Sequence, residues 1–221
     1  MNKLILLFVL ALPHSIALAD DFADSSVQLF DGQTLAGWEG DAYWFRVEDK
    51  SIVAGRIDQA IPHNVFLCTT ANYDDFELRL DVKLVRADES EPGPNAGPNA
   101  GVQFRSKRIP GDTEVSGYQA DAGEAWGRSV WGALFDESRR KQMLAEGDPE
   151  LVERLTKPDD WNSLRIVCRG QHVQIFLNGQ QTVDYIEEDK DIPVYGMIGL
   201  QIHSGPATEA WYRNIRIRQF Q

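Results

Sequence analysis

Hydrophobic and polar residues alternate along much of the chain, most clearly over residues 75–86. Apolar side chains from Phe76 to Leu84 fall on one face of this segment, and charged side chains from Glu77 to Lys83 fall on the other. Successive side chains of a β-strand point to opposite sides, so a period of two predicts a half-buried strand. Shorter runs predict further strands at 43–47, 65–69, 101–105, 130–135, 164–168, 173–177, 197–203 and 211–220.

Turns separate these short strands, which predicts an all-β sandwich or jelly roll. Asn178 and Gly179 stand between two alternating runs, and this pair favours the type I′ turn of a β-hairpin because both central residues need a positive φ. The topology is therefore expected to be largely antiparallel. Only residues 138–155 have a helical composition, and a Gly-Asp-Pro sequence at 147–149 interrupts them. We expect two short helices in a surface insertion there.

The chain begins with a pattern typical of a cleaved secretory signal. A short polar start with Lys3 precedes an apolar run, and small residues ending at Ala19 precede two aspartates. Pro13 interrupts the run well short of the roughly 20 apolar residues that a membrane span needs. We therefore expect residues 1–19 to be removed, residues 20–221 to form one domain, and the protein to be periplasmic or secreted.

The charge of the chain argues against a nucleic-acid partner. The formal net charge is −12, whereas binding to phosphate backbones needs clustered Lys and Arg. The sequence also lacks a Gly-rich phosphate loop, a CxxC pair, an HExxH helix and a nucleophile elbow, so nucleotide, thiol-redox, zincin and α/β-hydrolase chemistry have no support. Cys68 and Cys168 lie in predicted strands and could form a disulfide or stay buried thiols.

Residues 87–100 have the composition of a loop. Asp88, Glu89 and Glu91 could bind calcium there, but a ligand spacing such as that of the EF-hand loop is absent. Acidic loops are commonly just solvated, so a solvated loop is favoured. The sequence identifies no cofactor, and a divalent cation stays possible.

Residues 117–140 have the composition of a site rather than of a scaffold. They combine two Trp, four carboxylates, three Arg and four Gly, where an ordinary strand and turn would need none of them. The segment divides into a strand at 117–121, a Gly-Trp turn at 122–129, and a strand that ends in adjacent acids, Asp136 and Glu137. Loops at strand ends are common places for catalytic groups.

Seven separated motifs, in the same order as in the family, resemble the 3-keto-disaccharide hydrolase domain, formerly a domain of unknown function. They are Leu29-Phe-Asp-Gly-Gln-Thr-Leu-Ala-Gly-Trp38, Asn99-Ala-Gly-Val-Gln-Phe-Arg-Ser106, Gly117-Tyr-Gln-Ala-Asp121, Trp161-Asn-Ser-Leu-Arg-Ile-Val167, Leu177-Asn-Gly179, Ile198-Gly-Leu-Gln-Ile-His203 and Tyr212-Arg-Asn-Ile-Arg-Ile217. Many members carry a Glu after the Gly-Tyr pair. This chain has Gln119 there and Asp121 two residues later.

The resemblance implies a fold and a reaction. The fold is the concanavalin A-like jelly-roll sandwich of two antiparallel sheets, here with the helical insertion around 138–155. The reaction is cleavage of a glycoside whose sugar is already oxidised at C3, an oxidation that another protein would perform. The ketone acidifies the C2 proton, so a base removes it, the group at C1 leaves, and water adds back. This route needs a base, a donor or cation for the enolate oxygen, and an acid for the leaving group.

Strand parity assigns candidates to these roles. Gln103 and Arg105 share one face of their strand, and Gln201 and His203 share one face of theirs. Gln119 and Asp121 also share a face, whose direction the neighbouring residues leave open. The catalytic candidates are Asp121 or His203 as base, Arg105 or a bound cation at the enolate oxygen, and Asp136 or Glu137 as acid. The sugar-binding candidates are Gln103, Tyr118, Gln119, Glu124, Trp126, Trp131 and Gln201.

Structural alternatives stay open for these residues. Arg105 could pair with an acid, His203 could be a turn residue, Asp121 could cap its turn, and Asp136 or Glu137 could cap a helix or pair with a following Arg. The expected ligand is a sugar or 3-keto-glycoside. For the whole chain, a noncatalytic carbohydrate-binding module of the same fold is the second interpretation, and a structural or adhesion domain is the third.

Overall fold

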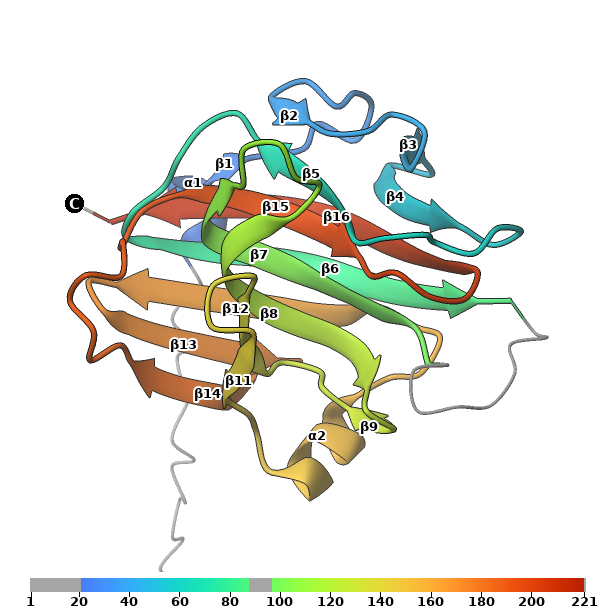
Figure 1. Ribbon diagram of the computed structural model, residues 1–221. Helices are drawn as coiled ribbons and strands as arrows, with labels where there is room; N and C mark the ends of the chain where they lie inside the picture. The colour runs from blue at the N-terminus through green and yellow to red at the C-terminus, as the bar shows by residue number, and fades with distance from the viewer. Residues whose placement is uncertain (1–20, 88–96, 221) are drawn as a thin grey trace, which may run out of the picture.

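Two antiparallel β-sheets lie face to face in the computed structural model, which describes residues 21–87 and 97–220 (Figure 1). This architecture confirms the predicted all-β sandwich. The predicted leader (residues 1–19) and the acidic residues Asp88, Glu89 and Glu91 lie outside the described residues. None of the helices within 21–87 and 97–220 has the length and apolar character needed to cross a membrane.

Sheet A has the strongly alternating strand of the sequence, β6 (Phe76–Arg86), at its centre. One face of β6 packs into the core, and the other carries its charged residues. In spatial order the strands are β14 (Gln180–Ile186), β13 (His172–Leu177), β12 (Asn162–Arg169), β6, β16 (Thr208–Gln219), β4 (Ser51–Arg56) and β3 (Phe45–Glu48), with β1 (Val27–Gln28) paired to β16.

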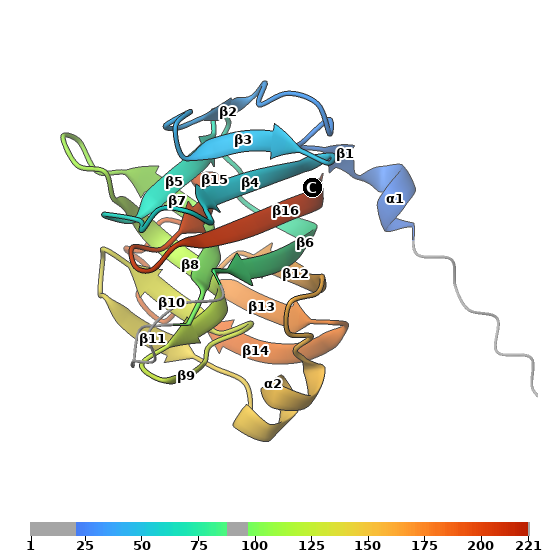
Figure 2. The same cartoon turned by 90° about the vertical axis from the view of Figure 1, so that its right-hand side faces the viewer.

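Three neighbouring strands in the middle of sheet B carry three of the seven family motifs. In spatial order its strands are β11 (Gln142–Ala145), β10 (Leu134–Glu137), β8 (Val115–Ala125), β7 (Asn99–Arg108), β15 (Met197–Ile202), β5 (Val65–Thr69) and β2 (Trp38–Glu39), with β9 (Arg128–Ser129) paired to β8. Figure 2 shows the two sheets from the side, with α1 (Phe22–Ser25) beside β1 and α2 (Pro149–Leu155) beside β9.

Two predicted elements differ from the structure. The strand expected at 130–135 begins only at Leu134, because Gly132 has a positive φ of 70° within a turn. The expected pair of helices at 138–155 is one strand, β11, and one helix, α2. Met, Leu and Ala favour helices, but β11 pairs with the edge of β10, and tertiary pairing overrides a weak local propensity. The predicted hairpin is confirmed, with positive φ at Asn178 and Gly179.

The core lies between the sheets, and aromatic rings from both sheets meet in it. The Phe104 ring centroid lies 5.6 Å from that of Tyr118 and 6.4 Å from that of Phe76, so the rings join the two sheets. Full burial of one large apolar side chain in such a core stabilises the fold by about 1.5–3 kcal/mol. Cys68 and Cys168 are both buried and unpaired, which decides between the two alternatives for them.

Tyr212 crosses from sheet A to the middle of sheet B. Its hydroxyl is buried and donates to the backbone oxygen of Gln201 at 2.5 Å. The backbone oxygen of Gly101 is a second, longer acceptor, 3.3 Å from the same hydroxyl. We expect Tyr212→Phe to lower the free energy of unfolding by about 1 kcal/mol, the net value of a typical hydrogen bond. Urea unfolding measures this change. Tyr195→Phe, at an exposed tyrosine, is the matched control, and an equal loss in both variants would contradict the prediction.

Candidate active site

Polar side chains collect on the outer face of sheet B because the core takes the alternate residues. In β8, Tyr118, Ala120 and Ala122 are buried towards sheet A, so Gln119 and Asp121 project outward. The same parity turns Gln103, Gln201 and Glu137 outward on β7, β15 and β10. This arrangement settles the direction that the sequence left open for Gln119 and Asp121.

A cavity of about 300 Å³ opens on this outer face, and we call it the site cavity. It brings together five of the predicted site residues, contributed by different strands and by the turn that follows β8. They are Gln119, Asp121, Trp126, Glu137 and His203. Apolar walls with a few placed polar groups are the usual form of a small-molecule site.

A directional chain of hydrogen bonds holds Asp121. Ser106 Oγ donates to Gln103 Oε1 at 3.0 Å, Gln103 Nε2 donates to Gln119 Oε1 at 2.5 Å, and Gln119 Nε2 donates to Asp121 Oδ1 at 2.6 Å. All four side chains are buried, so each amide has its orientation fixed by its neighbour. Gly101 leaves space for these hydrogen-bonded side chains, because a Cβ there would lie 2.4 Å from Gln119 Cδ.

The carboxyl groups of Asp121 and Glu137 both have raised pKa values. Burial raises the pKa of Asp121 to about 8, and the negative charge of Glu137 adds to the increase, against the hydrogen bond from Gln119. Burial also raises the pKa of Glu137, as does the nearby charge of Glu114. Gln201 Nε2 donates to Glu137 Oε2 at 3.3 Å. A pair of buried carboxyl groups with shifted pKa values is a candidate acid and base.

Trp126 and His203 form the rim of the site cavity. Trp126 has a positive φ of 52° in the tight turn that joins β8 to β9, and the residue is 57% exposed. The Trp126 ring centroid lies 6.2 Å from that of Phe135. His203 follows β15, and its Nδ1 lies 2.7 Å from the backbone oxygen of Ser204, so it is both a turn residue and a wall of the cavity.

Arg105 does not join the site. The register of β7 against β8 shifts after Phe104, and Arg105 has a positive φ of 48°, which re-aims its side chain. The buried guanidinium donates to the backbone oxygens of Asp74 and Gly170 and pairs with Asp75 Oδ1 at 3.0 Å. The prediction that Arg105 shares a face with Gln103 is therefore wrong, and its structural alternative, pairing with an acid, is what the structure contains.

Asp136 and Tyr118 lie on the core side of sheet B, so they do not line the site cavity. Asp136 is fully buried and accepts from Arg139 Nε at 2.8 Å and from Arg140 Nε. Tyr118 donates to Glu187 Oε2 at 2.6 Å, and Arg140 pairs with the same carboxylate. Parity separates the adjacent acids: Glu137 points outward and Asp136 inward. The ion network explains Asp136 without a catalytic role.

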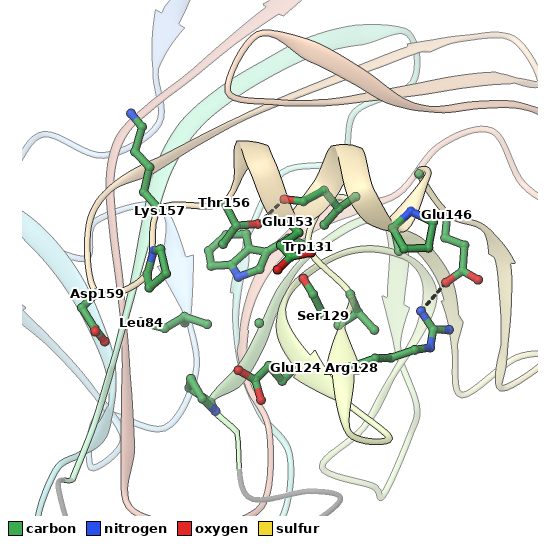
Figure 3. A pocket seen from close by; sticks show the side chains of 18 of the residues that line it. Leu84, Glu124, Arg128, Ser129, Trp131, Glu146, Glu153, Thr156, Lys157 and Asp159 are labelled. Atoms are coloured by element: carbon green, nitrogen blue, oxygen red, sulfur yellow. Dashed lines mark hydrogen bonds and ion pairs between the residues drawn. The ribbon is translucent and has the colours of Figure 1, made fainter.

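Trp131 and Glu124 line a different cavity, of about 500 Å³, which we call the end cavity (Figure 3). It lies beside α2, where Trp131 sits among Leu84, Ser129 and Thr156 in the close view. Arg128 and Glu146 form an ion pair of 2.5 Å at its edge. Trp131 is therefore not a wall of the site cavity. The end cavity is the larger of the two, but it is not the candidate active site, because Asp121 and Glu137 line the site cavity instead.

Sequence reasoning missed several residues of the site cavity. They are Asn64, Asn99, Glu114, Phe135, Ser138 and Lys141. Lys141 and Ser138 belong to the β10–β11 hairpin, which the helical composition of that segment concealed. The described residues contain no group of three or more His, Cys, Asp or Glu placed to hold a metal ion.

The chain matches a family model over residues 25–218, described as a 3-keto-alpha-glucoside-1,2-lyase-like domain. The chain belongs to this family. The match confirms the resemblance drawn from the seven motifs and covers both sheets of the sandwich. A comparison with curated proteins found no match.

Solved structures similar to this member of the family share its fold at low sequence identity. A candidate glycosyl hydrolase from Parabacteroides distasonis has a TM-score of 0.65 at 19% identity, covering 92% of this chain and 97% of that one. The carbohydrate-binding module CBM66 from Bacillus subtilis has a TM-score of 0.57 at 14% identity, covering 83% and 96%. A Bacillus subtilis protein of unknown function with a galectin-like fold has 0.56 at 13%, covering 84% and 90%.

Proposed function

We propose that this protein cleaves 3-keto-glycosides, by removal of the C2 proton and elimination at C1, on the outer face of sheet B. The observation that carries the proposal is the pair Asp121 and Glu137, two carboxyl groups with raised pKa values that line one cavity with Gln119 and His203. Membership of a lyase-like family supports the reaction class. We also propose the secretory signal at residues 1–19 and a periplasmic or secreted location.

The two carboxyl groups take different roles at neutral pH. Burial, and to a lesser extent the negative charge of Glu137, raise the pKa of Asp121 to about 8, so Asp121 keeps its proton at neutral pH. Glu137 is then the base, and Asp121 is the acid. Because Gln119 donates to Asp121 Oδ1, the proton of Asp121 belongs on Oδ2. The sequence alone offered Asp121 or His203 as the base and Asp136 or Glu137 as the acid, so the roles proposed here for Asp121 and Glu137 are reversed.

The steps balance with these two groups. Glu137 takes the C2 proton, the electron pair moves towards the C3 carbonyl oxygen, and the enolate forms. The C1–O bond then breaks as the enolate reforms the ketone and a C1–C2 double bond, and Asp121 gives its proton to the departing oxygen. Water then adds to C1 and gives a proton to Asp121, and Glu137 returns its proton to C2, which restores both carboxyl groups. Lys141, which lines the site cavity, is the cation available for the enolate oxygen in place of Arg105.

A noncatalytic sugar-binding role is the second candidate, favoured by the similarity to a carbohydrate-binding module. One experiment separates the two. A 3-keto-disaccharide is incubated with the protein in D₂O, with and without a chelator, and release of the free sugar and deuterium at C2 are followed by NMR. We expect both signals. Binding without either signal would support the module and overturn the lyase.

The pH dependence of turnover tests the roles of the two carboxyl groups. Catalysis needs ionised Glu137 and protonated Asp121, so kcat/KM is expected to fall as the pH rises through the pKa of Asp121, about 8. The acidic limb belongs to Glu137 and lies above the ordinary range for a glutamate. A pH–rate profile measures both limbs. Turnover that instead rises through pH 8 would make Asp121 the base.

A further inference from the structure

A smaller cavity of about 160 Å³ adjoins the site cavity, and we call it the side cavity. The two cavities share walls, namely Asn99, Ala125, Trp126 and His203. Thr208, at the start of β16, lines only the side cavity. A ligand that fills the site cavity can therefore extend past Trp126 into a second compartment.

Two residues that line the side cavity each carry a buried polar atom without a hydrogen-bond partner among the described residues. Thr208 is 2% exposed and its Oγ1 is unpartnered. Asn99 Oδ1 is also buried and unpartnered. Asn99 Nδ2 donates to the backbone oxygen of Glu124 at 2.9 Å, which fixes the amide so that Oδ1 is the free end. Buried polar groups are nearly always paired, so an unpaired donor and acceptor on one cavity point to a ligand that pairs them.

The lining of the side cavity matches a sugar ring. A hydroxyl that donates and accepts and an amide oxygen that accepts suit neighbouring sugar hydroxyls. The exposed Trp126 ring and Pro206 offer apolar surfaces to the C–H face of a ring. The acid that serves the leaving group, Asp121, belongs to the adjoining site cavity.

We propose that the side cavity is the subsite for the leaving-group sugar, with Thr208 and Asn99 as specificity-determining residues. This inference rests on the proposed function, because it takes the keto-sugar to lie in the site cavity. It predicts that a second sugar ring, rather than an apolar aglycone, increases affinity. A threonine whose hydroxyl has no partner among the described residues is thereby assigned to the ligand.

Binding measurements test the subsite independently of turnover. Calorimetry compares the 3-keto derivatives of maltose and of methyl α-glucoside, both in the Glu137→Gln background so that neither is consumed. We expect the disaccharide to bind at least tenfold more tightly. Adding Thr208→Val is expected to reduce that ratio by about 3- to 10-fold, the effect of one hydrogen bond. Thr208→Ser, which keeps the hydroxyl, is expected to restore the ratio.

The thermal stability of the same variants distinguishes a ligand-binding threonine from a structural one. Thr208→Val removes an unpaired buried hydroxyl, so its Tm is expected to stay equal or rise. The matched control is Thr182→Val, which loses a satisfied bond to the Gly132 backbone oxygen at 2.7 Å and is expected to lose stability but keep the ratio. A ratio unchanged by Thr208→Val, or equal affinity for both ligands, would overturn the subsite. Ligands that bind with the expected ratio but are never cleaved by the wild type would leave the subsite standing and remove the lyase.

Discussion

Asp121→Asn is expected to lower kcat/KM for a 3-keto-disaccharide by about 10²- to 10⁴-fold, the usual contribution of a positioned acid or base. The substitution removes the proton that the leaving oxygen needs. It keeps the local structure, because an asparagine Oδ1 can still accept from Gln119 Nε2. Steady-state kinetics on the purified variant measures the loss. An unchanged kcat/KM would remove Asp121 from the mechanism.

A substrate whose leaving group departs without protonation distinguishes the role of the acid from the role of the base. A 3-keto-glucoside of 4-nitrophenol needs no protonation of its leaving oxygen, so Asp121→Asn is expected to recover most of the lost turnover on it. Glu137→Gln is the matched variant, because it removes the base and is expected to stay inactive on both substrates. Equal losses for Asp121→Asn on the two substrates would contradict the acid role.

The same variant has an expected effect on stability, and its sign follows from the pKa. The pKa of Asp121 rises from 3.8 to about 8 on folding, so its contribution to stability is full below pH 3.8 and is lost as the pH rises to about 8. Asparagine carries no such charge. We expect Asp121→Asn to gain several degrees of Tm over the wild type at pH 9, and this gain to vanish near pH 4. A Tm difference between the variant and the wild type that does not change with pH would contradict the prediction that the Asp121 charge is buried.

Asp136→Asn is expected to lower the free energy of unfolding by about 3 kcal/mol, at the low end of the cost of breaking a buried ion pair. Asp136 has no exposure and holds both Arg139 and Arg140, whereas the two arginines partly reach solvent, which limits the loss. Arg140 also pairs with Glu187 at 2.6 Å, so the change weakens a network. Urea unfolding measures the loss.

The control for Asp136 is an exposed ion pair. Asp184→Asn breaks a surface contact with His172 and is expected to leave the free energy of unfolding nearly unchanged. Because Asp136 lies on the core side of β10, its variant should turn over substrate normally at temperatures where it is folded. A stable Asp136→Asn protein without turnover would restore Asp136 as a candidate acid.

Much of the site was visible in the sequence through strand parity. Alternation correctly put Gln103, Gln119, Asp121 and Gln201 on one side of their strands, since the core accepts only every second residue. The parity argument failed at Arg105, because a bulge inserts a residue and reverses the direction that follows. The pairing of β11 with β10 also escaped it, since the helical composition of residues 138–155 concealed the second strand of this hairpin.

The sequence by itself determined the family, the sandwich fold and the face on which the polar residues gather, because these follow from local alternation and from motifs that are contiguous in the chain. Only the tertiary structure decided which acids meet. It places Asp121 and Glu137 at one cavity and turns Asp136 and Tyr118 into the core, and it moves Trp131 to the end cavity. Burial and the charge of a distant neighbour set the pKa of a carboxyl group, and neither can be read from the residues beside it.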